Sequence, residues 1–313
     1  MHYINTLREG ENISEVFFCK SKISAKNKSD KTYYSLVLQD KTGTIDAKVW
    51  DLTSGIDYFE PKDYIAVDGQ VTSYNNQLQL NLRRIRRARE GEYAVADYMP
   101  VSPYSIDQMK DALARVIAVV ENSYLKTLLD KFFTGNGSIL EEFSRHSAAK
   151  SVHHSFIGGL LQHSLFVAKT CQFLAGQYRI LNRDLLVTAA LLHDVGKLKE
   201  ISDFPENDYT DEGQLLGHIV IGAMWIGEKI KEIPGFPKKL RDELLHCILA
   251  HHGELEFGSP KKPALVEALA LSFADNIDAK MESFEELLKA NPDNAGWLGF
   301  NRLFDSNVRK TEG

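Results

Sequence analysis

Cysteine is scarce in this sequence, and its few copies are far apart. The 313 residues include three cysteines, Cys19, Cys171 and Cys247. An odd number of widely spaced thiols argues against a disulfide framework and against a zinc site built from thiolates. We therefore expect the three cysteines to be small buried side chains rather than functional groups.

A secretory leader and a membrane-spanning run are lacking as well. Residues 1–9 do not show a basic stretch followed by an apolar one. The apolar run at residues 185–192 is too short to cross a bilayer, which takes about 20 residues. No internal repeat is visible. We expect a soluble, cytoplasmic protein without membrane contact, and the length is sufficient for two domains.

A net positive charge is also lacking, since the formal net charge is -6. Residues 1–95 hold 14 Lys and Arg against 13 Asp and Glu, whereas the remainder holds 23 against 30. Lysines gather at residues 20–31, and five arginines lie within residues 83–89. Because salt screens charges beyond about 8 Å, such local groups can attract a phosphate backbone even on an acidic protein. Two solvated loops would explain them equally well.

Residues 1–93 carry the pattern of short strands. Aromatic and β-branched runs lie at residues 15–19, 33–38, 44–50, 64–71 and 78–82. The third run alternates with period two and follows the turn sequence DKTG, which predicts a hairpin. Five strands with no helix between the early ones predict a small closed β-barrel.

The strand order resembles an OB-fold, above all in residues 36–45 (LVLQDKTGTI) and 67–71 (VDGQV). OB barrels bind single strands by stacking bases on aromatic side chains beside a basic groove. The resemblance implies a nucleic-acid-binding domain over residues 1–93. Its candidate contact residues are Tyr33, Tyr34, Trp50, Tyr74, Arg83 and Arg84. For each aromatic residue, packing in the barrel core or at its rim is the alternative interpretation.

Residues 94–150 are interpreted as a helical connector. Pro100 and Pro103 mark its beginning, and residues 105–108 (SIDQ) have the form of a capping box, which predicts a helix start at Ser105. Apolar residues then recur at helical spacing, as expected for a packing helix with no catalytic role. A second helix is predicted at residues 125–133.

Residues 151–290 are typical of an all-α domain in which polar residues recur in apolar surroundings. Residues 191–197 (LLHDVGK) place an imidazole and a carboxylate at the end of an apolar run. Burying such groups without partners would cost several kcal/mol, on the order of the transfer free energies of polar groups. The residues that share this character are His163, His193, Asp194, His218, His251, His252 and Asp275.

Imidazole and carboxylate ligands together favour a divalent transition metal. Convergent histidines without an ion would leave lone pairs unpaired. Asp194 has two carboxylate oxygens and could bridge two ions. One ion would be completed by His163, His193 and Asp275, and the other by His218 with His251 or His252. Two ions about 3.5 to 4 Å apart can activate a hydroxide for attack on a phosphodiester, which makes His193 and Asp194 candidate catalytic residues.

The order His163, His193-Asp194, Asp275 is the signature of the HD phosphohydrolase superfamily, and the additional histidines resemble its two-metal members. Lys197 matches a position that faces a substrate phosphate in related enzymes, although a solvated lysine at a helix end is the alternative. His153 and His154 are further candidates for the lining of the cleft. The expected fold class is multidomain α and β, with a five-stranded OB-like barrel followed by an all-α HD-domain helical bundle.

A barrel followed by this helical domain, over nearly the whole chain, is similar to the YhaM family of bacterial 3′→5′ exoribonucleases. The resemblance implies that single-stranded RNA, with single-stranded DNA as a second substrate, is hydrolysed to nucleoside 5′-monophosphates. It favours two Mn²⁺ ions, with Co²⁺, Fe²⁺, Ni²⁺ and Zn²⁺ as alternatives. Two other functions stay open: an HD-family nucleotide or cyclic-dinucleotide phosphohydrolase with a regulatory barrel, and a non-catalytic single-strand-binding protein. Residues 291–313 form a C-terminal tail, apolar enough to dock on the body or on another copy in a homo-oligomer.

Overall fold

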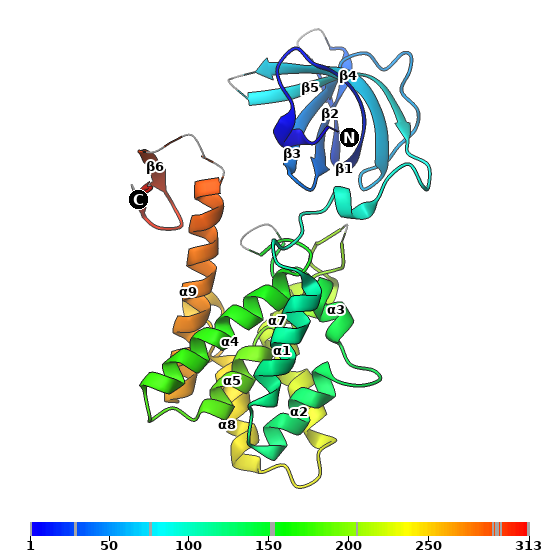
Figure 1. The fold of residues 1–313 in the computed structure, drawn as a ribbon. Helices are drawn as coiled ribbons and strands as arrows, with labels where there is room; N and C mark the ends of the chain where they lie inside the picture. The colour runs from blue at the N-terminus through cyan, green and yellow to red at the C-terminus, as the bar shows by residue number, and fades with distance from the viewer. Residues whose placement is uncertain are drawn as a thin grey trace. The chain divides into compact units, whose positions relative to one another are not determined.

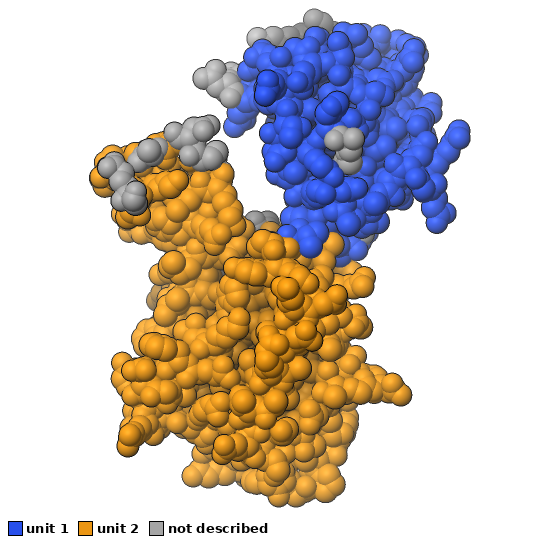
Figure 2. Space-filling model, viewed as in Figure 1, with its two compact units in different colours: residues 1–101, 204–206 blue, residues 102–203, 207–313 orange. Residues whose placement is uncertain are grey.

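The computed structural model divides the chain into two compact units, coloured separately in Figure 2. Unit 1 comprises Met1–Val101 with Phe204–Glu206, and unit 2 comprises Ser102–Asp203 and Asn207–Gly313. The structure describes residues 2–27, 30–74, 77–150, 154–204, 206–289, 291, 294 and 296–311. Asn75 and Asn76, which lie between the predicted strands 64–71 and 78–82, and the candidate residue His153 are outside the described residues.

Unit 1 is a closed five-stranded barrel in the order β1-β2-β3-β5-β4, as the sequence predicts (Figure 1). Its strands are β1 (Asn12–Lys26), β2 (Thr32–Asp40), β3 (Gly43–Val49), β4 (Tyr64–Tyr74) and β5 (Gln77–Arg87). Neighbouring strands pair antiparallel except β3 and β5, which pair in parallel and close the barrel. The OB-like architecture is therefore confirmed.

The alternation of apolar residues along the strands determines which side chains fill the barrel. On β4, Ile65, Val67, Gly69 and Val71 are buried, and the alternate residues between them are partly exposed. A β-bulge lies between Asp68 and Gly69, where the register to β5 shifts. A Cβ at Gly69 would approach the carbonyl oxygen of Asn81 to 2.5 Å, so only glycine fits this close approach of the two strands.

Several helices of unit 2 have first turns that are capped by side chains. Ser105 accepts a hydrogen bond from the backbone N–H of Gln108, as the capping box predicts. Asn122 caps α2 and Asn182 caps α5 in the same way. The helices are α1 (Ile106–Ala118), α2 (Ser123–Phe133), α3 (Leu140–Arg145), α4 (Gly159–Gln177), α5 (Arg183–Leu192), α6 (Lys197–Glu200), α7 (Asp211–Lys231), α8 (Lys238–Leu249) and α9 (Val266–Lys289).

Helix α5 lies at the centre of the helical core. Every residue of Leu185 to Leu192 is buried, and the helix packs against α2, α4, α8 and α9. The buried apolar cluster of unit 2 includes side chains from α1 and α2, so the connector helices share its core. No helix in the described part of the chain is long and apolar enough to cross a membrane. A hairpin of β6 (Trp297–Asn301) and β7 (Ser306–Arg309) follows α9.

Glycine allows the short helix α6 to pack directly on α7. A Cβ at Gly196 would lie 2.0 Å from the carbonyl oxygen of His218 and 2.7 Å from the backbone nitrogen of Gly222. Both of those atoms belong to α7 and cannot move as a side chain would. Gly196 therefore fixes the distance between the His193-Asp194 segment and His218.

We expect Gly196→Ala to lower the free energy of unfolding by about 1 to 3 kcal/mol, because the added methyl group forces the two backbones apart. Gly227→Ala is the matched control, since a Cβ there meets nothing within 4 Å on the same helix α7. It should be neutral or stabilising by about 0.5 to 1 kcal/mol. Thermal unfolding of both variants is monitored by circular dichroism. Equal unfolding midpoints for Gly196→Ala and Gly227→Ala would contradict close backbone packing at Gly196.

Candidate metal centre

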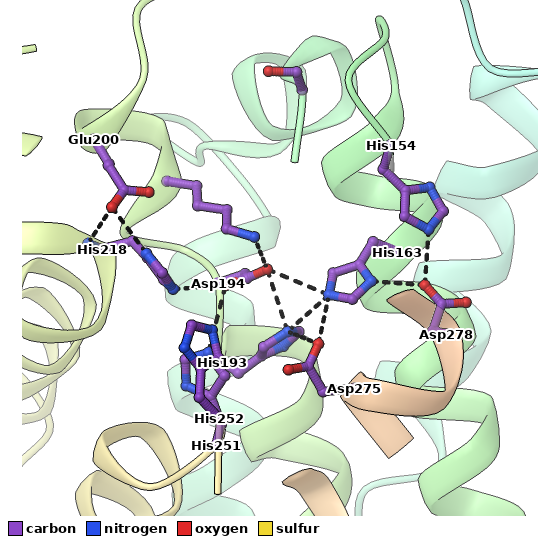
Figure 3. A network of polar contacts seen from close by, with 12 residues as sticks. His154, His163, His193, Asp194, Glu200, His218, His251, His252, Asp275 and Asp278 are labelled. Atoms are coloured by element: carbon purple, nitrogen blue, oxygen red, sulfur yellow. Dashed lines mark hydrogen bonds and ion pairs between the residues drawn. The ribbon is translucent and has the colours of Figure 1, made fainter. Parts of the chain in front are cut away.

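Five helical segments of unit 2 bring the seven predicted polar residues to one place (Figure 3). His163 lies in the first turns of α4, and His193 and Asp194 follow the last residue of α5. The remaining residues lie just after a kink in α7, just after the end of α8, and in the middle of α9; they are His218, His251, His252 and Asp275. All are buried or nearly so.

The first group of donor atoms surrounds one oxygen of Asp194. Its Oδ2 lies 3.3 Å from Nε2 of His163 and 3.3 Å from Nε2 of His193. The two imidazole nitrogens are 3.1 Å apart. Oδ1 of Asp275 completes the group at 3.2 Å from His163 and 3.8 Å from His193. Ligands bonded to one ion at about 2.0 to 2.2 Å are separated by roughly 3.0 to 3.5 Å, so these spacings suit a shared cation.

A second group surrounds the other oxygen of Asp194. Oδ1 lies 3.5 Å from Nε2 of His218 and 3.7 Å from Nε2 of His251. All three atoms are buried and have no hydrogen-bond partner among the described residues. His252 adds a further ring, whose centroid is 4.4 Å from that of His251. Buried lone pairs that face one another without a partner are unfavourable unless a cation lies between them.

The other ring nitrogen of each histidine fixes the direction of its lone pair. Nδ1 faces an oxygen acceptor in all five rings: Asp278 for His163, Ala190 for His193, Glu200 for His218, Ile248 for His251 and Phe257 for His252. A carbonyl or carboxylate oxygen only accepts, so each Nδ1 carries a proton, and in the neutral form of each ring Nε2 presents the lone pair. Metal-binding histidines in proteins are oriented in this way.

The electrostatics around His163 and Asp194 favour positive charge in the first donor group. Burial alone would lower the pKa of His163, but hydrogen bonds to the surrounding aspartates outweigh it and raise the pKa well above its usual value. Burial would raise the pKa of Asp194, but Lys197 and the neighbouring histidines hold it well below the usual range. An environment that favours a proton also favours a metal ion, because both carry positive charge.

The residue types and their arrangement therefore fit a divalent transition metal. The donors are imidazole nitrogens and carboxylate oxygens, a set suited to Mn²⁺, Fe²⁺, Co²⁺, Ni²⁺ or Zn²⁺. Buried, unpartnered atoms of Asp194, His218 and His251 point toward one another, which an apolar packing role would not produce. The two oxygens of Asp194 face different donor groups, as a bridging carboxylate would.

Lys197 lies at the edge of the cluster rather than in solvent. Its Nζ is 2.6 Å from Oδ2 of Asp194, and 14% of its side chain is exposed. Burial would lower the pKa of Lys197, but Asp194 outweighs this effect and raises it, so the ammonium is retained. The ion pair excludes the alternative of a free solvated lysine.

Three residues of this network do not appear in the predicted ligand set. Asp278 accepts hydrogen bonds from His163 and from His154, and Glu200 accepts from both Nδ1 and the backbone N–H of His218. Burial alone would raise the pKa of Asp278, but its two histidine partners lower it to about 2. Asp278 follows Asp275 by three residues, which places both on one face of α9. This spacing is the one sequence signal that indicates a role for Asp278.

The candidate nucleic-acid contacts of unit 1 lie on or next to its strands. Tyr33 on β2 packs against Trp50 at the end of β3, with ring centroids 4.6 Å apart and Trp50 43% exposed. Tyr34 packs edge-on against buried Phe59 and receives the ammonium of Lys22 at 4.6 Å from its ring. Tyr74, Arg83 and Arg84 are exposed on β4 and β5. The structure thus brings Tyr33 and Trp50 together but not the remaining four.

The class of protein follows from the two units. The family model described as "HD domain" matches residues 160–280, which contain both donor groups. The model described as "OB-fold nucleic acid binding domain" matches residues 19–88 of the barrel. The chain combines an HD domain with an OB-fold nucleic-acid-binding domain.

Known proteins are similar to this chain along most of their length. A "3'-5' exoribonuclease YhaM" of Geobacillus sp. (strain WCH70) is 35% identical over 288 residues, which are 90% of this chain and 86% of that protein. The protein of the same name from Bacillus subtilis (strain 168) is 33% identical over 282 residues, covering 90% and 88%. This chain belongs to the YhaM family.

Metal binding should stabilise the helical unit. A ligand at 100 times its dissociation constant adds about 2.7 kcal/mol to the native state, so saturating Mn²⁺ should raise the unfolding midpoint by about 5 to 10 °C. Asp194→Asn should lose most of this shift, because the neutral amide offers the ions no charge. Asp242→Asn is the control, since Asp242 is an exposed residue paired with Arg241 on α8. Equal Mn²⁺ shifts in both variants would remove Asp194 from the proposed ligands.

Proposed function

We propose that this protein is a metal-dependent 3′→5′ exoribonuclease that releases nucleoside 5′-monophosphates from single-stranded RNA. One observation carries the proposal: lone pairs of five imidazoles and two aspartates converge on a buried point in an HD domain. Membership of the YhaM family supports the substrate and the direction of degradation. Single-stranded DNA is proposed as a second substrate and the cytoplasm as the place of action.

The proposed ligands divide into two groups that share Asp194. His163, His193 and Asp275 would hold one ion together with Oδ2, and the histidines around Oδ1 would hold the other. Bound divalent ions would supply activation of water and neutralisation of charge at the scissile phosphate. The donor set suits Mn²⁺, Fe²⁺, Co²⁺, Ni²⁺ and Zn²⁺ alike, and Mn²⁺ is favoured among them because the resemblance to the YhaM family implies it.

Other residues of the chain position these donors and the substrate. Lys197 holds its ammonium next to Asp194, where it can donate to a phosphate oxygen of a bound strand. Glu200 orients His218, and the backbone carbonyl oxygens of Ala190 and Ile248 orient His193 and His251. Since these partners fix the rings before substrate arrives, no reorganisation is required when charge develops at phosphorus.

The barrel is proposed to hold the single strand. Tyr33 and Trp50 form a partly exposed pair of rings on which bases could stack without regard to base identity. Arg83 and Arg84 are exposed on β5 and could contact phosphates. A small nucleotide would need no such surface, and the barrel therefore favours RNA over free nucleotides as the substrate.

Single substitutions in the centre should separate binding from hydrolysis. His193→Ala and Asp194→Ala should each reduce the rate of RNA degradation by about 1,000-fold or more, because each removes a donor with no substitute nearby. Both variants should still bind RNA. His246→Ala is the matched control, since His246 lies on α8, the helix that ends just before His251, and its Nε2 accepts a hydrogen bond from the backbone of Ala264.

The measurement uses end-labelled single-stranded RNA with Mn²⁺ and resolves the products by gel and by mass. The expected products of the unmodified chain are nucleoside 5′-monophosphates released from the 3′ end. Rapid hydrolysis by His193→Ala and Asp194→Ala would refute the assignment of the centre. Hydrolysis of free nucleotides or cyclic dinucleotides in preference to RNA would favour the alternative HD phosphohydrolase.

Replacing the aromatic pair should weaken RNA binding without altering the metal centre. A stacked base contributes about 1 to 3 kcal/mol, so Trp50→Ala and Tyr33→Ala should each raise the RNA dissociation constant by about 10-fold. Tyr178→Ala, an exposed tyrosine after α4, serves as the control. Fluorescence anisotropy with labelled RNA in the absence of Mn²⁺ gives the three constants. Unchanged affinity in both barrel variants would exclude the pair from RNA binding.

A further inference from the structure

Asp278 contacts the cluster from outside the two donor groups. Its Oδ2 lies 2.7 Å from Nδ1 of His163 and 2.8 Å from Nε2 of His154 (Figure 3). Asp275, one helical turn earlier on α9, faces the opposite nitrogen of His163 at 3.2 Å. One turn of α9 therefore holds both nitrogens of the same imidazole ring.

The contacts of Asp278 determine the protonation of the ring. A carboxylate only accepts hydrogen bonds, so both nitrogens that face Oδ2 must carry protons. With its proton on Nδ1, the neutral ring of His163 directs an unprotonated Nε2 at His193 and Asp194. Only 11% of the Asp278 side chain is exposed, so water competes little for these hydrogen bonds.

An unusual backbone conformation at His154 places its ring against Asp278. His154 is fully buried and has a φ of 60°, a left-handed conformation that is uncommon for histidine. Its carbonyl oxygen accepts a hydrogen bond from the N–H of Ala148. A Cβ at Gly159 would lie 2.0 Å from that oxygen, so glycine at the start of α4 is required for this conformation. Strained conformations of this kind persist where the surrounding structure holds them in place, often at functional sites.

The partners of the histidines differ in charge. Nδ1 of His193 and of His251 donates to a neutral backbone carbonyl within three residues, whereas His163 donates to a carboxylate 115 residues away. Hydrogen bonds to ionised groups are roughly twice as strong as those between neutral groups. A carboxylate on Nδ1 also makes the opposite nitrogen a better metal ligand.

We propose that Asp278 is a positioning residue, held in place by His154, that fixes the tautomer and orientation of His163 and thereby sets the metal affinity of the first donor group. This inference rests on the proposed function only in taking that group to be a metal site. Asp278 is not itself a ligand, since the nitrogen that faces it carries a proton.

Substitutions of Asp278 in the full-length protein test this role. Asp278→Ala removes the acceptor, and Asp278→Asn retains a neutral one. Titration with Mn²⁺, with free Mn²⁺ followed by electron paramagnetic resonance, should show about 10- to 100-fold weaker binding at one of the ions in Asp278→Ala, and a smaller loss in Asp278→Asn. His154→Ala should weaken binding in the same direction by less. Glu285→Gln, an exposed change on the same helix, is the matched control and should leave affinity unchanged.

A second measurement reports the tautomer directly. Long-range ¹H–¹⁵N spectra of ¹⁵N-histidine-labelled protein, recorded with diamagnetic Zn²⁺, distinguish Nδ1–H from Nε2–H rings. The unmodified chain should show His163 protonated at Nδ1, and Asp278→Ala should lose that signature. At saturating Mn²⁺ the variants should regain most of their kcat, because the ligands themselves are intact.

The outcomes separate the possibilities. Unchanged metal affinity and an unchanged His163 signature in folded Asp278→Ala would overturn the inference, even if the unfolding midpoint fell. Loss of one whole equivalent of metal in both Asp278→Asn and His154→Ala would instead identify these residues as ligands and also overturn it. Failure of the unmodified chain to hydrolyse RNA, with weakened Mn²⁺ binding in Asp278→Ala, would contradict the proposed function alone.

Discussion

The structure of the helical unit depends on the burial of one carboxylate. Asp194 is 1% exposed and lies at the end of an entirely buried stretch of α5. Placing an ionised group there is costly unless positive charge and hydrogen-bond donors surround it. The ammonium of Lys197 supplies one such partner. The imidazoles from α4, α5, α7 and α8 direct lone pairs at the same carboxylate, so a cation shared with Asp194 would supply the remaining positive charge.

At the C-terminal ends of α5 and α8, a single hydrogen bond both caps the helix and orients a histidine of the cluster. The last carbonyl oxygens of a helix have no partner within it. His193, just after α5, donates from Nδ1 to the carbonyl oxygen of Ala190, and His251, just after α8, donates to that of Ile248. Each bond satisfies a terminal carbonyl and at the same time turns Nε2 toward Asp194. Helix termination and the orientation of the proposed ligands therefore have a common cause.

Much of this could be predicted from the sequence, because the signals are local. Alternation on β4 predicts the barrel, the capping box at Ser105 predicts a helix start, and the apolar setting of His193 and Asp194 identifies the centre. Glu200 and Asp278 escaped prediction because their roles depend on distant contacts. Each lies in a segment with other acidic or basic residues, where a carboxylate normally faces solvent. Only the fold shows that Glu200 contacts a histidine 18 residues away and Asp278 one 115 residues away.

For the basic residues of the barrel, the sequence predicts more free positive charge than the structure has. Arg86 and Arg87 belong to the arginine-rich segment that suggested a phosphate-binding surface, yet they form ion pairs with Glu92 and Asp63. Lys26 is paired with Asp30 in the same way. A paired cation releases fewer counterions when it meets a phosphate, because its charge is already compensated. The barrel consequently has less free positive charge than its composition indicates, so the proposed stacking of bases on Tyr33 and Trp50 would supply a larger share of any affinity for a single strand.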